Sequence, residues 1–240
     1  MKTNLYLIRH GESISAVKHI IGNLGLTPLG VTQAEHLRDR LAGTGEIAAD
    51  VLISSTLLRA KETAEIIAPA LRLPIIFDEE VEEMRVGEAE GMTDTQLREA
   101  FGIVSAEEDP FRPIAPGGES WVQFMQRMGH ALYRITHQYE GKTIVVVCHG
   151  GIIEGSFYYF FGLSTLQGPQ AHFSTRNTSI THWQQSASRE PGQPGRWHLK
   201  KYDDDVHLRD IDTPVRIPWQ ELRPRPLTGS DQPAVPIKTE

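Results

Sequence analysis

Two histidines in this sequence each follow a short apolar run and precede a glycine. His10 comes after the run Leu5–Ile8, with Arg9 directly before it, and His149 comes after the run Thr143–Cys148. Such runs are typical of buried strands in a parallel sheet. Open α/β sheets bind their ligands at the carboxyl ends of these strands. A histidine delivered there can serve as nucleophile or base, and the arginine beside it can bind an anion.

Two further polar groups are predicted to reach the same edge. Arg59 follows the apolar run Asp50–Ile53 and lies in the first turns of a predicted helix, whose amino end also attracts anions. The acidic stretch Glu82–Gly87 follows the run Pro74–Phe77, so a carboxylate from this stretch can also reach the edge. Two histidines, two arginines and a carboxylate suit phosphoryl transfer. One histidine would attack phosphorus, the cations would balance the charge on oxygen, and the carboxyl group would protonate the leaving oxygen.

The elements that would position these groups alternate between strand and helix patterns. This alternation predicts a three-layer α/β/α fold, with a mostly parallel central sheet and helices on both of its faces. The predicted helices cover residues 28–42, 57–71, 93–101, 120–139 and 152–163. Thr27 is the expected N-cap of the first, with Pro28 at its first position. Residues 179–183 and 197–201 are expected to form two antiparallel strands joined by a loop at 188–192.

Composition limits the class of protein. The chain has 24 basic and 31 acidic side chains and a net charge of −7, which argues against a nucleic-acid partner or an acidic membrane surface, but not against a small anionic substrate. A single cysteine excludes an internal disulfide and favours a reducing compartment. The sequence shows no signal-peptide pattern and no apolar run long enough to span a bilayer, so we expect a cytoplasmic protein.

The end of the chain differs in composition from the rest. From Tyr202 onward Asp, Pro and Arg dominate and hydrophobic periodicity disappears. We expect one domain over residues 1–218 and an extended or disordered tail over 219–240. The sequence does not decide between a monomer and a homodimer.

Four blocks of the sequence resemble, in order, the signature segments of the histidine phosphatase superfamily, the phosphoglycerate-mutase-like fold. They are Leu7–Ser13, Ser54–Ala64, Glu83–Gly91 and Val147–Gly151. The segment Leu26–Gly30, with Gln33 and Ala34, also fits, so the resemblance spans residues 4 to 183. One block alone would be weak evidence, but four in order at matching spacing are highly specific.

The resemblance implies a role for each central residue. His10 would be the nucleophile that becomes a phosphohistidine. Glu83 would donate a proton to the leaving group and then act as base for the attacking water. The phosphoryl group would be bound by Arg9, Arg59, His149 and Gly150. No metal and no cofactor are implied, because the arginines balance the phosphoryl charge.

Some positions depart from the family pattern or allow a second interpretation. Ala16 stands where the family often has an asparagine that contacts phosphate, and Asn23 is our candidate to replace that contact. Glu82 competes with Glu83 as the acid. Cys148 ends an apolar strand, which favours a buried, inert thiol. The run Asp203–Asp205 with His207 is interpreted as a solvated turn rather than a metal site.

Three functions remain open from the sequence, and one is favoured. The family's mutases carry a longer, basic insertion that closes over the substrate, whereas the stretch 91–118 here is short and has only Arg98 and Arg112 as basic residues. An open site favours hydrolysis, so we expect a phosphomonoesterase acting on a small phosphorylated substrate. The alternatives are a phosphoglycerate mutase and a non-catalytic phospho-ligand binder. Both His10 and Glu83, whose loss would indicate such a binder, are present.

Overall fold

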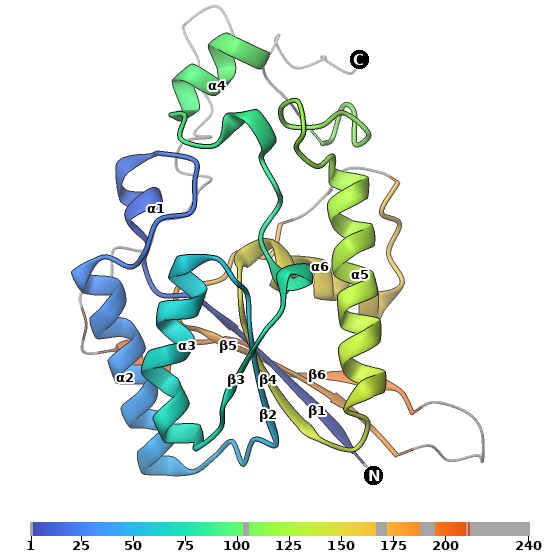
Figure 1. The fold of residues 1–240 in the computed structure, drawn as a ribbon. Helices are drawn as coiled ribbons and strands as arrows, with labels where there is room; N and C mark the ends of the chain where they lie inside the picture. Colours follow the sequence, from blue (N-terminus) through green and yellow to red (C-terminus); the bar gives the residue numbers. More distant parts are fainter. Residues whose placement is uncertain (1, 103–105, 167–171, 188–194, 210, 212–240) are drawn as a thin grey trace, which may run out of the picture.

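The centre of the protein is a six-stranded sheet in the order β3-β2-β4-β1-β5-β6 (Figure 1). The computed structural model describes residues 2–102, 106–166, 172–187, 195–209 and 211. The strands are β1 (Thr3–Arg9), β2 (Val51–Ser54), β3 (Ile75–Phe77), β4 (Thr143–Cys148), β5 (Ile180–Gln185) and β6 (Trp197–Asp204). The first four are mutually parallel, whereas β5 runs antiparallel to both β1 and β6. The predicted mostly parallel α/β fold is confirmed.

Helices cover both faces of the sheet (Figure 1). On one face lie α2 (Pro28–Thr44) and α3 (Leu58–Leu71), and on the other α5 (Trp121–Gln138) and α6 (Gly150–Phe161). Two short helices, α1 (Ile14–Lys18) and α4 (Asp94–Phe101), lie beyond the edge where the parallel strands end. Three single 3₁₀ turns are η1 (Glu79–Val81), η2 (Gly87–Ala89) and η3 (Val206–Leu208).

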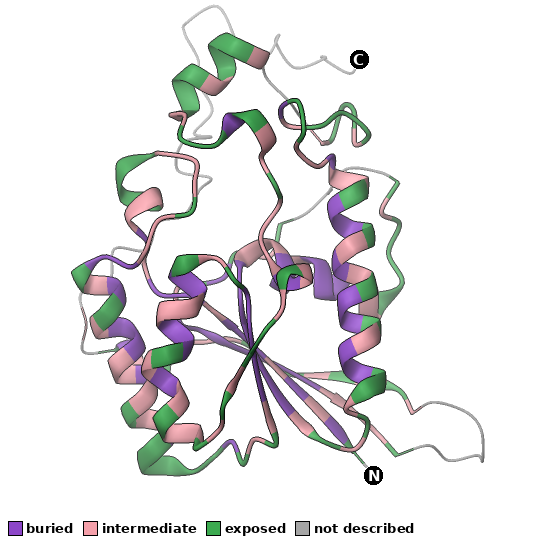
Figure 2. Cartoon of the chain, viewed as in Figure 1, coloured by how far each residue is buried: buried purple, intermediate pink, exposed green. Residues whose placement is uncertain are grey.

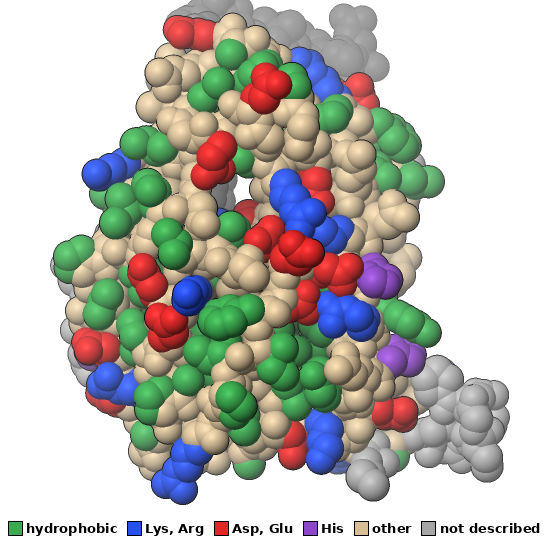
Figure 3. Space-filling view, in the orientation of Figure 1, with side chains coloured by type: hydrophobic (Ala, Val, Ile, Leu, Met, Phe, Trp, Pro, Cys, Tyr) green, Lys and Arg blue, Asp and Glu red, His purple; other side chains and the backbone are tan. Residues whose placement is uncertain are grey.

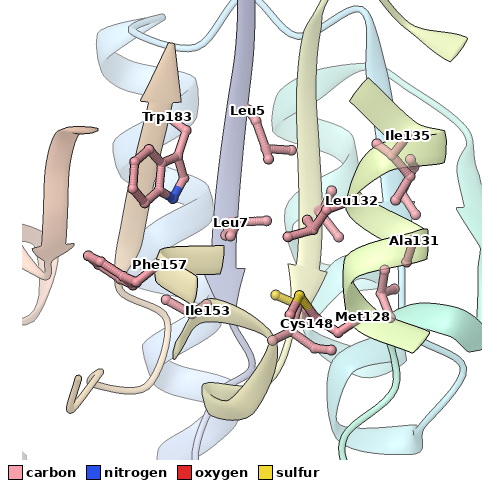
Figure 4. Packing of buried hydrophobic residues seen from close by; sticks show 14 of the residues in the cluster. Leu5, Leu7, Met128, Ala131, Leu132, Ile135, Cys148, Ile153, Phe157 and Trp183 are labelled. Carbon is pink, nitrogen blue, oxygen red and sulfur yellow. The ribbon is translucent and has the colours of Figure 1, made fainter. Parts of the chain in front are cut away.

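Alternate side chains of the strands feed two separate cores. Leu5 and Leu7 of β1 pack with the apolar faces of α5 and α6, where Leu132 and Phe157 are fully covered (Figure 4). Ile8 of β1 faces the other way, toward α2 and α3. Figure 2 shows the resulting pattern, with buried residues along the strands and along the inner sides of the helices. Burial of both sheet faces is what the continuous apolar runs of the parallel strands predict.

The expected elements are present, with shifted ends. Thr27 caps α2 as predicted, since its side chain accepts a hydrogen bond from Gly30 N at 3.0 Å. α6 begins at Gly150, two residues earlier than expected, which makes His149 its N-cap. α1 was not expected, because five residues are too few to show a helical period; Ser13 caps it. The predicted tail and the loop at 188–192 lie outside the described residues, so the domain boundary at 218 stays a prediction.

The surface of the protein carries charged side chains of both signs (Figure 3). On the face drawn in Figure 3, acidic and basic side chains are interspersed, without one large basic area. None of the helices in the described part of the chain is long and apolar enough to cross a membrane.

Gly30 lets α2 approach the turn that follows β1. A Cβ atom at Gly30 would overlap the carbonyl oxygen of Glu12, and one at Gly11 would come within 2.5 Å of the carbonyl oxygen of Gly30. Neither contact can be relieved by a side-chain rotation, because both partners are backbone atoms. The segment Gly11–Glu12 is therefore held directly against the amino end of α2.

This close approach predicts a difference between two glycines of one helix. We expect Gly30→Ala to lower the free energy of unfolding by about 2 kcal/mol, because the backbones must separate. Gly43→Ala, where a Cβ atom meets nothing within 4 Å, should leave it unchanged or raise it by less than about 1 kcal/mol. Urea unfolding of both variants provides the measurement, and equal effects would contradict the packing described here.

Candidate active site

His10 and His149 meet at the carboxyl edge of the sheet. β1 and β4 pair in parallel with Arg9 opposite Cys148, and His10 N donates to the carbonyl oxygen of Cys148 at 3.0 Å. The two imidazole rings lie 5.1 Å apart between centroids. His10 is 6% exposed and His149 is fully covered. The two predicted strand ends thus bring both histidines into one buried site.

Arg59 contacts His10 directly and fixes its tautomer. Arg59 Nε donates to His10 Nε2 at 3.2 Å, so this nitrogen carries a lone pair. The hydrogen of the ring is therefore on Nδ1, which donates to the carbonyl oxygen of Gly11 at 2.7 Å. Arg59 also donates to the carbonyl oxygen of Gly22 at 3.3 Å. The result is an imidazole whose Nε2 is unprotonated beside a cation.

The side chains of Thr63 and Asn177 hold the turn that follows β1. Gly11 N donates to Thr63 Oγ1 at 3.0 Å, and the same hydroxyl donates to the carbonyl oxygen of Arg59 at 2.7 Å. Asn177 Nδ2 donates to the carbonyl oxygen of His10 at 2.8 Å. The carbonyl oxygen of His10 and the N–H of Gly11 belong to one peptide unit, and both are therefore hydrogen-bonded to side chains outside β1.

Arg9 is oriented by the loop that precedes β5. Its guanidinium donates to the carbonyl oxygen of Thr175, while its Nε is buried and has no hydrogen-bond partner among the described residues. Gly150 lies against this group, since a Cβ atom there would be in van der Waals contact with Arg9 Nε, at 3.8 Å. A buried donor without a partner is costly, and a bound anion would satisfy it.

His149 has a similar unsatisfied nitrogen. Its Nε2 lies 2.8 Å from Ser55 Oγ, and that hydroxyl already accepts the N–H of Leu57 at 3.3 Å. The hydroxyl also carries one hydrogen of its own; when Ser55 donates it to Nε2, the imidazole hydrogen is on Nδ1. This Nδ1 is buried without a partner in the described part of the chain. His149 can thus offer one N–H to an anion.

The carboxylate of Glu83 contacts the amino end of α6, directly after His149. Its oxygens accept hydrogen bonds from Gly151 N at 3.1 Å and from Met84 N at 3.0 Å. A Cβ atom at Gly151 would collide with this carboxylate, so the glycine permits the approach. Glu82 instead accepts from Thr56 and lies 3.3 Å from Arg85 Nε.

A clamp that the sequence analysis did not single out holds the acidic segment. Arg127 of α5 forms two hydrogen bonds of 2.7 Å with the carboxylate of Glu119. The same guanidinium donates to the carbonyl oxygens of Glu80, Glu82 and Glu83 at 2.8 to 3.1 Å. Because one rigid fork contacts three carbonyl oxygens of this short segment, the position of Glu83 depends on α5.

Burial and positive charge together keep both imidazoles neutral. Burial lowers the pKa of His10 well below its ordinary value, and Arg59 and Arg9 lower it further. Burial likewise lowers the pKa of His149, with Arg59 the next largest cause. Burial also lowers the pKa of each arginine, and Glu83 acts against that change on both. The site therefore combines neutral histidines with two buried cations, which suits a dianionic ligand.

Comparison with known proteins places this geometry in a family. The sequence model of the histidine phosphatase superfamily, branch 1, matches residues 5–201. The chain belongs to the histidine phosphatase superfamily. The resemblance inferred from the four sequence blocks is thereby confirmed.

Relatives within the superfamily carry both mutase and phosphatase names. Phosphoglycerate mutase-like protein 4 of Arabidopsis thaliana is 34% identical over 64% of this chain and 69% of its own length. A probable phosphoglycerate mutase of Proteus mirabilis is 33% identical over 86% of this chain and 95% of its own. The chain spans 41% of a bifunctional protein of Mycobacterium tuberculosis, to which it is 35% identical.

Solved structures of the superfamily share the fold over most of the chain. YhfR of Bacillus stearothermophilus is 29% identical with a TM-score of 0.72, covering 86% of this chain and 99% of that one. Phosphoserine phosphatase of Entamoeba histolytica, solved with 3-phosphoglyceric acid, is 28% identical with a TM-score of 0.68 and the same coverage.

Three further predictions from the sequence concern Asn23, Cys148 and the run Asp203–Asp205. In the folded chain Asn23 lies near Arg59. Its Oδ1 accepts the N–H of Leu58 at 2.7 Å and so caps the amino end of α3. The contact of Asn23 with phosphate stays a prediction. Cys148 is buried as expected, which raises the pKa of its thiol. Among the described residues no group of three or more His, Cys, Asp or Glu side chains could hold a metal ion, Asp203–Asp205 included.

The low pKa values of the two site histidines predict how they titrate. As pH falls from about 8 to 6, an ordinary imidazole gains a proton, whereas His10 and His149 should stay neutral because their pKa values are lowered. Nitrogen-15 chemical shifts of the imidazoles, assigned with the His10→Asn and His149→Asn variants, measure this. Titration of either residue near its ordinary pKa would contradict the described electrostatics.

Proposed function

We propose that this protein is a metal-independent phosphomonoesterase that acts through a phosphohistidine at His10. The observation that carries the proposal is the unprotonated Nε2 of His10, beside Arg59 and in the same buried site as Arg9. A phosphoryl group entering there would take over the N–H of Arg59 that His10 now accepts. The two guanidinium groups would stabilise the charge that the phosphoryl oxygens carry in the transition state.

The proposed reaction has two steps. In the first, His10 Nε2 forms a bond to phosphorus, the ester P–O bond breaks, and Glu83 in its protonated form gives its proton to the leaving oxygen. In the second, Glu83 as carboxylate takes a proton from water, whose oxygen attacks phosphorus and breaks the N–P bond. Inorganic phosphate leaves, and His10 and Glu83 return to their starting states.

Hydrolysis is preferred to phosphoryl transfer between substrate positions. The stretch between η2 and α5 contributes α4 and a series of turns, and it carries Arg98 and Arg112 as its basic residues. A site not enclosed by a basic cover admits water to the phosphohistidine. The phosphoserine phosphatase of similar structure supports a small phosphorylated substrate, such as a phosphorylated amino acid or glycerate. The mutase-named relatives make phosphoglycerate mutation the second candidate.

Phosphate release from a panel of phosphomonoesters tests the proposal. We expect wild-type protein to hydrolyse an aryl phosphate in the presence of EDTA, and His10→Ala to reduce this by at least about 10³-fold, because the nucleophile is removed. Equal rates for both proteins would contradict catalysis by His10. Interconversion of 3- and 2-phosphoglycerate faster than phosphate release would assign the mutase function instead.

The role of Glu83 predicts a dependence on the leaving group. A phosphoserine oxygen needs protonation as it leaves, whereas p-nitrophenolate leaves readily without it. We therefore expect Glu83→Gln to lower kcat/KM, which reports the first step alone, by about 10² to 10⁴-fold for phosphoserine and much less for p-nitrophenyl phosphate. Glu82→Gln is the matched control and should change neither rate more than about twofold. Equal effects of Glu83→Gln on both substrates would contradict its role as acid.

A further inference from the structure

The loop that precedes β5 fixes the residues that hold phosphate. Thr175 accepts the hydrogen bond of the Arg9 guanidinium, and Asn177 donates to the carbonyl oxygen of His10. Thr178 N donates to the carbonyl oxygen of Arg9 at 3.0 Å. Three positions of one loop, far from residues 9 and 10 in the sequence, therefore set where Arg9 and His10 lie.

This loop has a conformation that it would not adopt unaided. Thr178 has φ +56°, in the left-handed region that a β-branched residue rarely occupies. Such a backbone costs free energy and persists only where surrounding contacts stabilise it. The structure must therefore contain groups that hold Thr178 in place.

Those groups come from the end of β6 and from η3. His207 Nε2 lies 2.9 Å from Thr178 Oγ1. Asp203 Oδ1 accepts the N–H of Arg176 at 2.6 Å, and Tyr202 donates its hydroxyl hydrogen to the carbonyl oxygen of Ser174. Contacts from residues 202–207 thus support the loop at three successive points.

Arg40 determines the tautomer of His207. Arg40 Nη1 lies 3.3 Å from His207 Nδ1, and a guanidinium can only donate, so Nδ1 carries the lone pair and Nε2 the hydrogen. His207 therefore donates to the hydroxyl of Thr178. Arg40 is itself fixed by two hydrogen bonds to Asp204, of 3.0 and 2.8 Å, and by Glu46.

The charges around His207 keep it in this neutral form. Burial lowers its pKa to about 4, and Arg40 and His36 lower it, whereas Asp204 and Asp205 oppose the change. Across the neutral pH range the Nε2–H is thus present and able to donate. A connected series of contacts runs from Arg40 through His207 and Thr178 to Arg9.

We propose that His207 and Asp203 are positioning residues for the phosphate-binding site, acting on Arg9 and His10 through the loop 174–178. The proposal rests on the proposed function where it is tested by kcat/KM. Its test by vanadate binding does not require that the protein turn over a substrate. Within the acidic run Asp203–Asp205, Asp203 thus supports the loop 174–178 through the N–H of Arg176, a role different from that of a metal site or a solvated turn.

The test compares three variants by the dissociation constant of orthovanadate, a phosphate mimic, from calorimetric titration, and by kcat and KM for p-nitrophenyl phosphate. We expect His207→Leu to weaken vanadate binding and lower kcat/KM by roughly tenfold each, because Arg9 is displaced. His207→Gln places an amide N–H near the position of Nε2 and should restore both to within about twofold. His198→Leu, an exposed histidine of β6, should match wild type.

Each outcome decides the proposal. The proposal is overturned if folded His207→Leu binds vanadate as tightly as wild type, whether or not its melting temperature is lowered. It is also overturned if His207→Gln loses as much vanadate affinity and kcat/KM as His207→Leu. If His207→Leu does not fold, Asp203→Ala is compared with Asp203→Asn. The asparagine keeps an oxygen acceptor and tolerates the positive φ at this position. Only the alanine variant should bind vanadate weakly. Wild-type protein that binds vanadate but hydrolyses no ester would defeat the proposed function while leaving this comparison valid.

Discussion

The buried positive charge of Arg9 and Arg59 is the constraint on which the site depends. Removing two guanidinium groups from water is costly unless other groups compensate. Glu83 is the carboxylate that acts most strongly on both, with Asp203 acting further on Arg9, and Glu90 and Glu82 on Arg59. Burial and this positive charge together lower the pKa values of His10 and His149. In the proposed mechanism the same charge would bind a dianionic phosphoryl group, so that one electrostatic requirement would link nucleophile, anion site and general acid.

The fold meets this requirement with backbone geometry and with contacts from distant segments. The parallel register of β1 and β4 sets the two histidines side by side. Glycines 11, 30 and 151 let the backbone approach where a Cβ atom would collide. Arg127 holds the acidic segment from one side, and the loop before β5 holds Arg9 and His10 from the other. The groups that react are thus fixed by residues that do not themselves react.

Sequence reasoning succeeds for groups that follow a periodic element directly. His10, Arg59 and His149 are found because apolar runs place them, and Glu83 because it belongs to a recognisable block. Asn177 and Arg127 escape, since their contacts depend on tertiary placement that no local period reveals. A signal does exist for Asn177: a strand antiparallel to β1 begins at the edge where β1 ends, so residues just before β5 must reach the site. The tautomers of His10 and His207 follow only from hydrogen-bond partners, which the sequence does not display.

The central claim is that His10 itself becomes phosphorylated during turnover. Rapid-quench reaction of the protein with a radiolabelled phosphomonoester, followed by alkaline digestion and peptide mapping, tests it most directly. We expect an acid-labile, alkali-stable phosphoryl group on the peptide that contains His10, formed at least as fast as steady-state turnover. Label on any other residue, or turnover without a phosphorylated protein under conditions that preserve phosphohistidine, would contradict it.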